Sequence, residues 1–227
     1  MAGGSVASAL RQVPVAPAST LGERLDAPSG RPPFPVAEPL AALLPSGGLR
    51  RGSVIAVHGS LSLLLALLAA ATAQGAWAAV IGVCDLGVLA AAEAGVVVRR
   101  LALVPRPGPD PAPVAAALLD GVGLVALAGA DRVPAGSRRT LAARARQRGS
   151  VLLPFGRWPG ADVELDCRTE AWHGTDDGHG RLRSREVVVR AMGRGAAARP
   201  RTARLLLPGP DGGVAKAIGH LAIKAVG

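Results

Sequence analysis

Gly59, Ser60 and Ser62 are the residues whose types and spacing come closest to phosphate chemistry. They follow a short apolar run, Val54–Val57, and lead into a segment rich in leucine and alanine, which is the strand, tight turn and helix start of a nucleotide-binding α/β domain. A working phosphate loop reads G-x-x-x-x-G-K-[ST], in which the lysine neutralises phosphates and the hydroxyl binds magnesium. Here Ser-Leu-Ser-Leu follows the glycine, and the two lysines of the chain lie near its C-terminus. We therefore expect a degenerate loop with no nucleotide cofactor.

The carboxylates that nucleotide hydrolysis needs are also displaced. An ATPase of this kind holds magnesium with an acidic residue at the end of a buried strand. The matching strand, Leu124–Ala128, runs into Gly129-Ala130, so Asp131 falls in the following loop. Asp85, after the second apolar run, stands where related folds place a water-activating acid, which alone is a weak signal. We therefore predict that the chain is not an enzyme.

A second candidate site is the polar stretch 172–180, which reads WHGTDDGHG. Its two histidines, His173 and His179, enclose two aspartates, Asp176 and Asp177, and such side chains can hold a divalent metal ion. Gly, Asp and Thr between two strand-like runs are also typical of a hairpin turn. We favour the turn and predict no metal site, because ligands on a glycine-flanked loop lack the outer-shell partners that orient metal ligands.

Arginine dominates the charge of the chain. Lysine and arginine number 26 against 16 acidic residues, and this net charge of +10 is typical of contact with nucleic acid or an acidic protein surface. Two clusters stand out, one on a predicted helix and one at alternate positions of a predicted strand: Arg138, Arg139, Arg144, Arg146 and Arg148, and Arg181, Arg183 and Arg185.

Alternate positions on a strand share a face, so guanidinium groups there can neutralise phosphates without reading sequence. Weak, non-specific DNA contact and an ordinary solvated face are both open interpretations of these clusters. Tight binding of single strands is not expected, because aromatic residues make up only 2% of the chain.

The elements that must position these residues alternate as in a wound α/β sheet, with unbroken aliphatic runs that suit buried parallel strands. The predicted strands are Val54–Val57, Trp77–Val83, Leu101–Val104, Leu124–Ala128 and Val151–Phe155. The predicted helices are Leu61–Gln74, Leu86–Ala94, Pro111–Asp120 and Ser137–Arg148, the last capped by Ser137 and ended by Gly149. Further strand-like runs without helices between them predict an antiparallel extension at one edge: Asp162–Trp172, Leu182–Ala191 and Thr202–Leu207.

The 227 residues suit one domain with flexible ends. Residues 1–38 are rich in Pro, Ala, Ser and Gly and predict a flexible arm, with a short helix near Val6–Gln12. Residues 39–213 form the predicted α/β domain, and residues 214–227 form an apolar tail in which Val214–Val226 has helical potential.

Cys84 and Cys167 lie far apart without a C-x-x-C partner, so we expect both to be reduced, buried and structural. The N-terminus lacks a convincing signal peptide, so we expect a cytoplasmic protein. The uncharged run Leu61–Val83 is about long enough to span a bilayer. Polar residues and glycines interrupt it, so we interpret it as a buried helix followed by a buried strand, with no membrane association.

Several stretches together resemble the core of the RecA recombinase. They are the order GGLxxGxxxxxxG from Gly47 to Gly59, the strand end Cys84-Asp85-Leu86, the segment Arg100–Pro105 and the Gly-His-Gly turn at 178–180. The region from about Leu40 to Gly213 is more closely similar to the actinobacterial RecA-like mutasome accessory proteins of the ImuA-prime family. The motifs that carry this resemblance are LVPRPGPD at 103–110, DGHG at 177–180, GRGAAARP at 193–200 and LLLPGPDG at 205–212.

The resemblance implies a RecA-like fold and an accessory role in error-prone translesion synthesis induced by DNA damage in the SOS response. Family members act with a catalytically inactive Y-family polymerase-like partner that docks on the sliding clamp, and with an error-prone C-family DNA polymerase. The chain would then be a scaffold in this complex. The alternative is a RecA-type, ATP- or DNA-dependent DNA repair enzyme. The loop lacks RecA's second glycine, lysine and threonine, so strand exchange and ATP hydrolysis are not carried over.

Overall fold

The computed structural model describes residues 30–176 and 179–217, with the backbone alone for 175–176 and 179–181. Within these residues, one sheet runs in the order β3-β2-β4-β5-β1-β6-β7-β8-β9. Its strands are β1 (Ile55–His58), β2 (Ala78–Ile81), β3 (Leu101–Val104), β4 (Leu124–Ala128), β5 (Val151–Phe155), β6 (Val163–Asp176), β7 (His179–Gly193), β8 (Arg201–Leu206) and β9 (Ala215–Lys216). The helices are α2 (Glu38–Ala41), α3 (Leu61–Ala73), α4 (Val88–Glu93), α5 (Ala112–Leu119) and α6 (Ala135–Arg148), and the short 3-10 turns are η2 (Val98–Arg100), η3 (Ala130–Arg132) and η4 (Gly195–Ala197).

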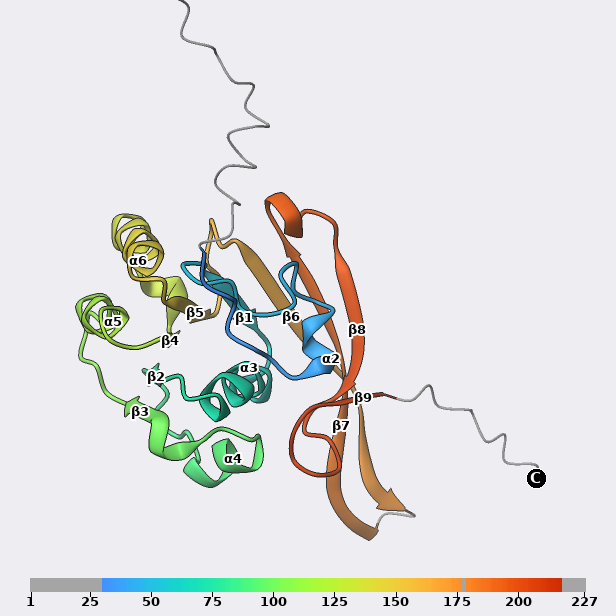
Figure 1. Ribbon diagram of the computed structural model, residues 1–227. Helices are drawn as coiled ribbons and strands as arrows, with labels where there is room; N and C mark the ends of the chain where they lie inside the picture. Colours follow the sequence, from blue (N-terminus) through green and yellow to red (C-terminus); the bar gives the residue numbers. More distant parts are fainter. Residues whose placement is uncertain (1–29, 177–178, 218–227) are drawn as a thin grey trace, which may run out of the picture.

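The sheet has a parallel half and an antiparallel half that meet at β6. Strands β3, β2, β4, β5, β1 and β6 are parallel to their neighbours, whereas β7, β8 and β9 continue the sheet as antiparallel neighbours. Helices α5 and α6 lie on one face of the sheet, and α2, α3 and α4 lie on the other (Figure 1). The predicted α/β class, with a mostly parallel sheet and an antiparallel C-terminal extension, is confirmed.

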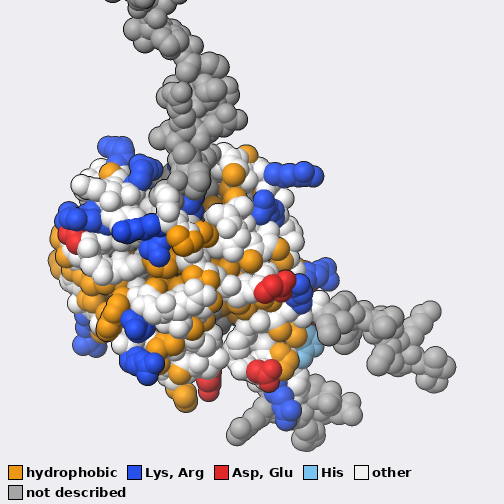
Figure 2. Space-filling model, in the orientation of Figure 1, with side chains coloured by type: hydrophobic (Ala, Val, Ile, Leu, Met, Phe, Trp, Pro, Cys, Tyr) orange, Lys and Arg blue, Asp and Glu red, His pale blue; other side chains and the backbone are white. Residues whose placement is uncertain are grey.

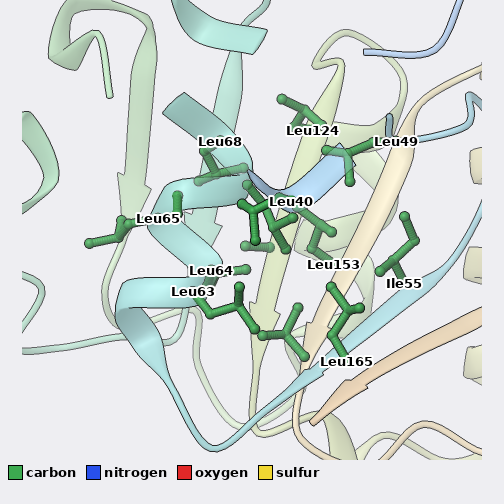
Figure 3. Close-up of a cluster of buried hydrophobic side chains, with 14 of the residues drawn as sticks. Leu40, Leu49, Ile55, Leu63, Leu64, Leu65, Leu68, Leu124, Leu153 and Leu165 are labelled. Atoms are coloured by element: carbon green, nitrogen blue, oxygen red, sulfur yellow. The ribbon is translucent and has the colours of Figure 1, made fainter. Parts of the chain in front are cut away.

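The central helix α3 is buried on nearly all sides. Eight of its residues are buried, because it lies between the sheet and the segment that carries α2. Figure 3 shows Leu63, Leu64 and Leu68 of α3 packed toward Leu40 and the strands beneath. A helix that is apolar all round is stable in water only when it is covered in this way. The same core continues under β6, β7 and β8, while a second core lies beneath α5 and α6.

The run Leu61–Val83 divides between α3 and β2, with positive φ at Gly75 and Gly82. This confirms its interpretation as a helix followed by a strand. Among the residues that the structure describes, no helix combines the length and the apolar character needed to cross a bilayer.

Two predicted features at element ends are wrong. Helix α6 begins at Ala135, directly after Pro134, so Ser137 lies inside the first turn and makes no cap. Proline is pre-organised for the start of a helix, and it sets the boundary ahead of the serine. The predicted end at Gly149 is confirmed, because Gly149 has a left-handed φ of 69° and terminates α6.

The helical potential assigned to Val214–Val226 is also not realised where the chain is described. Ala215–Lys216 form β9 and pair with β8, because the outer edge of β8 offers unpaired backbone groups. Residues 218–227 lie outside the described residues.

The packed chain begins ahead of residue 39. Phe34 and Leu49 exchange two backbone hydrogen bonds of 2.9 Å, the Phe34 ring is buried in the main core, and the Arg51 guanidinium lies 3.7 Å from its centroid. Residues 1–29 of the predicted arm, with the helix expected near Val6–Gln12, lie outside the described residues.

Candidate functional site

The degenerate loop is two residues long and is closed against the sheet. Strand β1 ends at His58 and α3 begins at Leu61, so only Gly59 and Ser60 join them. Gly59 has φ of 79°, and a Cβ at this position would lie 2.3 Å from the backbone oxygen of Cys167 in β6. A loop that wraps around a phosphate needs several successive backbone N–H groups facing the ligand. Here the chain instead turns sharply and packs on β6.

Ser60 is the N-terminal cap of α3. Its Oγ accepts a hydrogen bond of 3.2 Å from the backbone N–H of Leu63, and Ser62 lies in the first turn of the helix. The same Oγ accepts a hydrogen bond of 2.7 Å from Nη2 of Arg185, which comes from β7. The Ser60 hydroxyl is therefore engaged within the protein.

Arg185 ties the loop to two other segments. Its Nε donates to the backbone oxygen of Leu207 at 2.8 Å, and its guanidinium carbon lies 5.5 Å from the centroid of the Trp172 ring. The sequence predicted this arginine as a DNA-backbone contact together with Arg181 and Arg183. DNA contact by Arg185 stays a prediction, and two of its donors are already used inside the fold.

Cys167 lies beneath the loop and is buried, whereas Cys84 is exposed and donates to the backbone oxygen of Pro105 at 3.3 Å. Burial raises the pKa of the Cys167 thiol, and the nearby Ser60 hydroxyl and Arg185 charge oppose that shift. Both cysteines are free, as expected, but the prediction that both are buried is wrong for Cys84. A buried thiol with a raised pKa is a poor nucleophile, so Cys167 has the character of a packing residue.

The two displaced acids follow the ends of different strands. Asp131 lies in η3 beyond the end of β4, as expected, and Asp85 follows β2; both are exposed. Strands β4 and β5 separate β2 from β1, so at a spacing of about 4.8 Å the two strands lie roughly 14 Å apart. Among the described residues, no three side chains of His, Cys, Asp and Glu are grouped as metal ligands would be.

The polar stretch 172–180 forms the expected hairpin. Strands β6 and β7 pair as far as Asp176 and His179, and residues 177–178 lie outside the described residues. Nε2 of His173 lies 3.3 Å from Oε2 of Glu186 across the hairpin. The histidine therefore contacts the opposite strand, which fits the turn interpretation.

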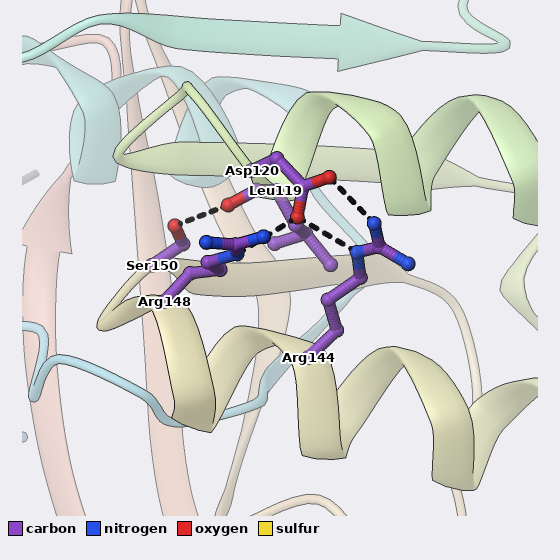
Figure 4. Close-up of polar contacts among 5 residues, drawn as sticks. All are labelled: Leu119, Asp120, Arg144, Arg148 and Ser150. Atoms are coloured by element: carbon purple, nitrogen blue, oxygen red, sulfur yellow. Dashed lines mark hydrogen bonds and ion pairs between the residues drawn. The ribbon is translucent and has the colours of Figure 1, made fainter.

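Two of the arginines predicted on α6 clamp the neighbouring helix. Arg144 donates two hydrogen bonds to the carboxylate of Asp120, at 2.8 and 2.5 Å, and Arg148 donates a third at 3.0 Å (Figure 4). The hydrogen bonds from Arg144 contribute most to lowering the pKa of Asp120 to about 2. Asp120 follows the end of α5, so the clamp fastens α5 to α6. DNA contact by Arg144 and Arg148 stays a prediction, because both side chains remain partly exposed in the clamp.

The Asp120 clamp predicts a change in acid stability. Because the folded pKa lies below that of the unfolded chain, the clamp stabilises the protein fully above about pH 4 and loses this contribution as the pH falls toward 2. Asp120→Asn should therefore lower the melting temperature at neutral pH and reduce the drop in melting temperature between pH 5 and pH 3. Scanning calorimetry of both proteins at pH 7, 5 and 3 measures these changes. A pH dependence identical to that of the unmodified chain would contradict this role.

The remaining predicted arginines are scattered. Arg138 donates to the backbone oxygen of Val133 at 2.7 Å and is half-buried. Arg139, Arg146 and Arg183 are exposed, and the side chain of Arg181 is outside the described residues. Helix α6 and the β6–β7 hairpin lie at opposite ends of the molecule, so the two clusters do not form one surface (Figure 1).

The structure instead gathers arginines that sequence patterns did not connect. A pocket of about 560 Å³ lies at the amino ends of β1 and β6, and it is lined by Arg31, Arg50, Arg51, Arg146 and Arg194. Arg50 and Arg51 precede β1, and Arg194 follows β7. They meet because Ile55 pairs with Val163, and Val163 pairs with Gly193. Arg146 belongs to the arginine cluster predicted on a helix, and Arg50 and Arg51 are adjacent in the sequence, but no pattern linked them to Arg31 or Arg194.

Comparison with known proteins yields one family and one close relative. Residues 42–160 match the family described as the MT3502 N-terminal domain. The chain is 41% identical over 163 residues to the uncharacterized protein Rv3395c of Mycobacterium tuberculosis (strain ATCC 25618 / H37Rv), a match that covers 67% of this chain and 80% of that protein. The chain belongs to the family of the MT3502 N-terminal domain.

Proposed function

We propose that this protein is a RecA-like, non-enzymatic accessory protein of a mutasome that carries out error-prone translesion synthesis after DNA damage. Its partner would be an inactive Y-family polymerase-like protein and, through it, an error-prone C-family DNA polymerase and the sliding clamp, in the cytoplasm. Weak DNA contact through Arg139, Arg146, Arg181 and Arg183 is a secondary part of this proposal. The sequence motifs shared with the ImuA-prime proteins support it.

The observation that carries the non-enzymatic part is the closed loop. A Cβ at Gly59 would clash with β6. The Ser60 hydroxyl oxygen already accepts hydrogen bonds from the Leu63 N–H and the Arg185 guanidinium. Transition-state stabilisation of phosphoryl transfer depends on a lysine, a magnesium ion and aligned N–H donors around the phosphates. A loop without the lysine, whose hydroxyl serves to cap a helix, supports a scaffold role better than a hydrolytic one.

Complementation of a gene deletion tests the proposal. Deletion should lower the frequency of mutations induced by ultraviolet light several-fold. The unmodified gene should restore it, and so should a gene with Asp85→Asn and Asp131→Asn, because neither exposed carboxylate would take part in catalysis.

The two contrary outcomes are distinct. An unchanged frequency of induced mutations in the deletion strain would refute the mutasome role. Failure of the folded double variant to complement, together with ATP turnover by the purified protein, would favour the alternative of a RecA-type ATP-dependent repair enzyme.

A further inference from the structure

We propose that the arginine-lined pocket at the amino ends of β1 and β6 is a docking site for an acidic peptide segment of a partner protein, with an apolar side chain among its carboxylates. The pocket lies at the opposite edge of the sheet from the Gly59–Ser60 loop, since it adjoins the starts of β1 and β6. The inference does not depend on the mutasome role proposed above.

The charge of the pocket is strongly unbalanced. Among the described lining residues, five arginines face one carboxylate, that of Asp162. This carboxylate is already used: it accepts a hydrogen bond of 2.8 Å from the backbone N–H of Val54 and lies 3.7 Å from Nη2 of Arg50. Figure 2 shows Lys and Arg side chains outnumbering acidic ones on the upper part of the molecule, around exposed apolar atoms. Such a surface attracts an anionic partner.

Repulsion between the arginines of the pocket also favours an anionic ligand. Burial and the neighbouring Arg31 charge both lower the pKa of Arg51, whose Nε donates to the backbone oxygen of Pro32. Arg194 donates to the backbone oxygen of Gly160. The side chain of Arg146 is exposed and makes no hydrogen bond or ion pair with another described residue. Carboxylates entering the pocket would relieve the repulsion and give Arg146 a partner.

The walls of the pocket are apolar. Ile55, Leu44, Val163 and Ala197 line it and are themselves at most 7% exposed. The volume of about 560 Å³ falls within the range of roughly 300–1,000 Å³ that is usual for binding pockets. A ligand that fills this space therefore needs an apolar group as well as negative charge.

These features favour a peptide over nucleic acid. Base recognition uses exposed aromatic faces or free polar groups. The Phe34 ring beside the pocket is buried beneath Arg51, and the hydroxyls of Ser46 and Ser53 donate to backbone oxygens at 3.1 and 2.5 Å. Glutamate or aspartate beside a leucine-like side chain matches both the arginines and the apolar walls.

Binding of a model peptide to the full-length chain tests the proposal. The probe is a fluorescein-labelled peptide with a central leucine flanked by glutamates, followed by fluorescence anisotropy. Peptides with glutamine for glutamate, or with glycine for leucine, should each bind at least about tenfold more weakly. The first loses the charge that the arginines attract, and the second loses the apolar side chain that fills the pocket. Added salt should weaken binding of the glutamate peptide and leave binding of the glutamine peptide unchanged.

Two variants on one helix provide a matched control. Arg146→Glu should weaken binding of the glutamate peptide about tenfold, since it reverses a charge at the pocket. Arg139→Glu, an exposed position on α6 outside the pocket lining, should leave it within about twofold. Equal losses in both variants, or equal binding of all three peptides, would overturn the proposal. So would tighter binding of a single-stranded oligonucleotide that depends on Arg146, because the pocket would then be a nucleic-acid site.

Discussion

Gly59→Ala is expected to lower the free energy of unfolding by about 3–5 kcal/mol, one of the largest effects of any single substitution in the chain. Two costs add. A left-handed φ of 79° is unfavourable for alanine by about 1–2 kcal/mol, and a Cβ would meet the backbone oxygen of Cys167 at 2.3 Å. The contact is with backbone in the middle of the sheet, so the loop or β6 must move. Urea unfolding followed by circular dichroism measures the loss.

Gly129→Ala is the matched control. Gly129 has a similar φ of 68°, but a Cβ there would find no atom within 4 Å. We therefore expect a loss of only about 1–2 kcal/mol, from the backbone conformation alone. Equal losses in the two variants would mean that the loop is not pressed against β6, and would remove the main support for a closed site.

Arg185→Met is expected to destabilise the protein by about 2 kcal/mol. The substitution keeps most of the apolar stem but removes the donors to Ser60 and Leu207, and hydrogen bonds from a charged group contribute about 1.5–3 kcal/mol each when little exposed. Arg185 is half-buried, so solvent screening should reduce the combined loss of the two bonds to about 2 kcal/mol. The shift of the urea midpoint at constant slope reports it.

Arg183→Met separates this structural role from the general effect of losing a charge. Arg183 lies on the same face of β7 two residues away and is exposed, so its replacement should change stability by no more than about 0.5 kcal/mol. Should Arg183→Met cost as much as Arg185→Met, the contacts of Arg185 with the loop would not be what stabilises the fold.

The parallel strands β1, β2, β4 and β5 could be predicted because each is a short, mostly buried aliphatic run, a pattern that is visible without knowledge of the partners. The edge strand β3 keeps the aliphatic run although none of its residues is fully buried. The predicted bounds of β3, β4 and β5 coincide with the observed strands. The starts of helices were harder to predict, as the start of α6 at Ala135 shows. Both Pro134 and Ser137 are typical of a helix start, and the sequence alone does not show which of them marks it.

The candidate sites depended on contacts that no local pattern carries. Arg185 and Ser60 are 125 positions apart, and their hydrogen bond exists only because β6 and β7 extend past the start of α3. The alternation of Arg181, Arg183 and Arg185 correctly placed them on one strand but could not show that one of them turns into the fold. For the same reason, the pocket at the amino ends of β1 and β6 required the strand register.

The main core, which continues from α3 beneath β6, β7 and β8, determines how much of the chain is expected to unfold together. The family match ends at residue 160, yet Leu165, Val189 and Leu205 pack in the same core as Leu64 of α3. A chain cut at that point would leave β1 as an unpaired edge and expose the underside of α3 to water. Residues 42–160 are therefore a unit of sequence relationship, whereas the packed core extends through β8, so we expect the chain to unfold as one unit through β8.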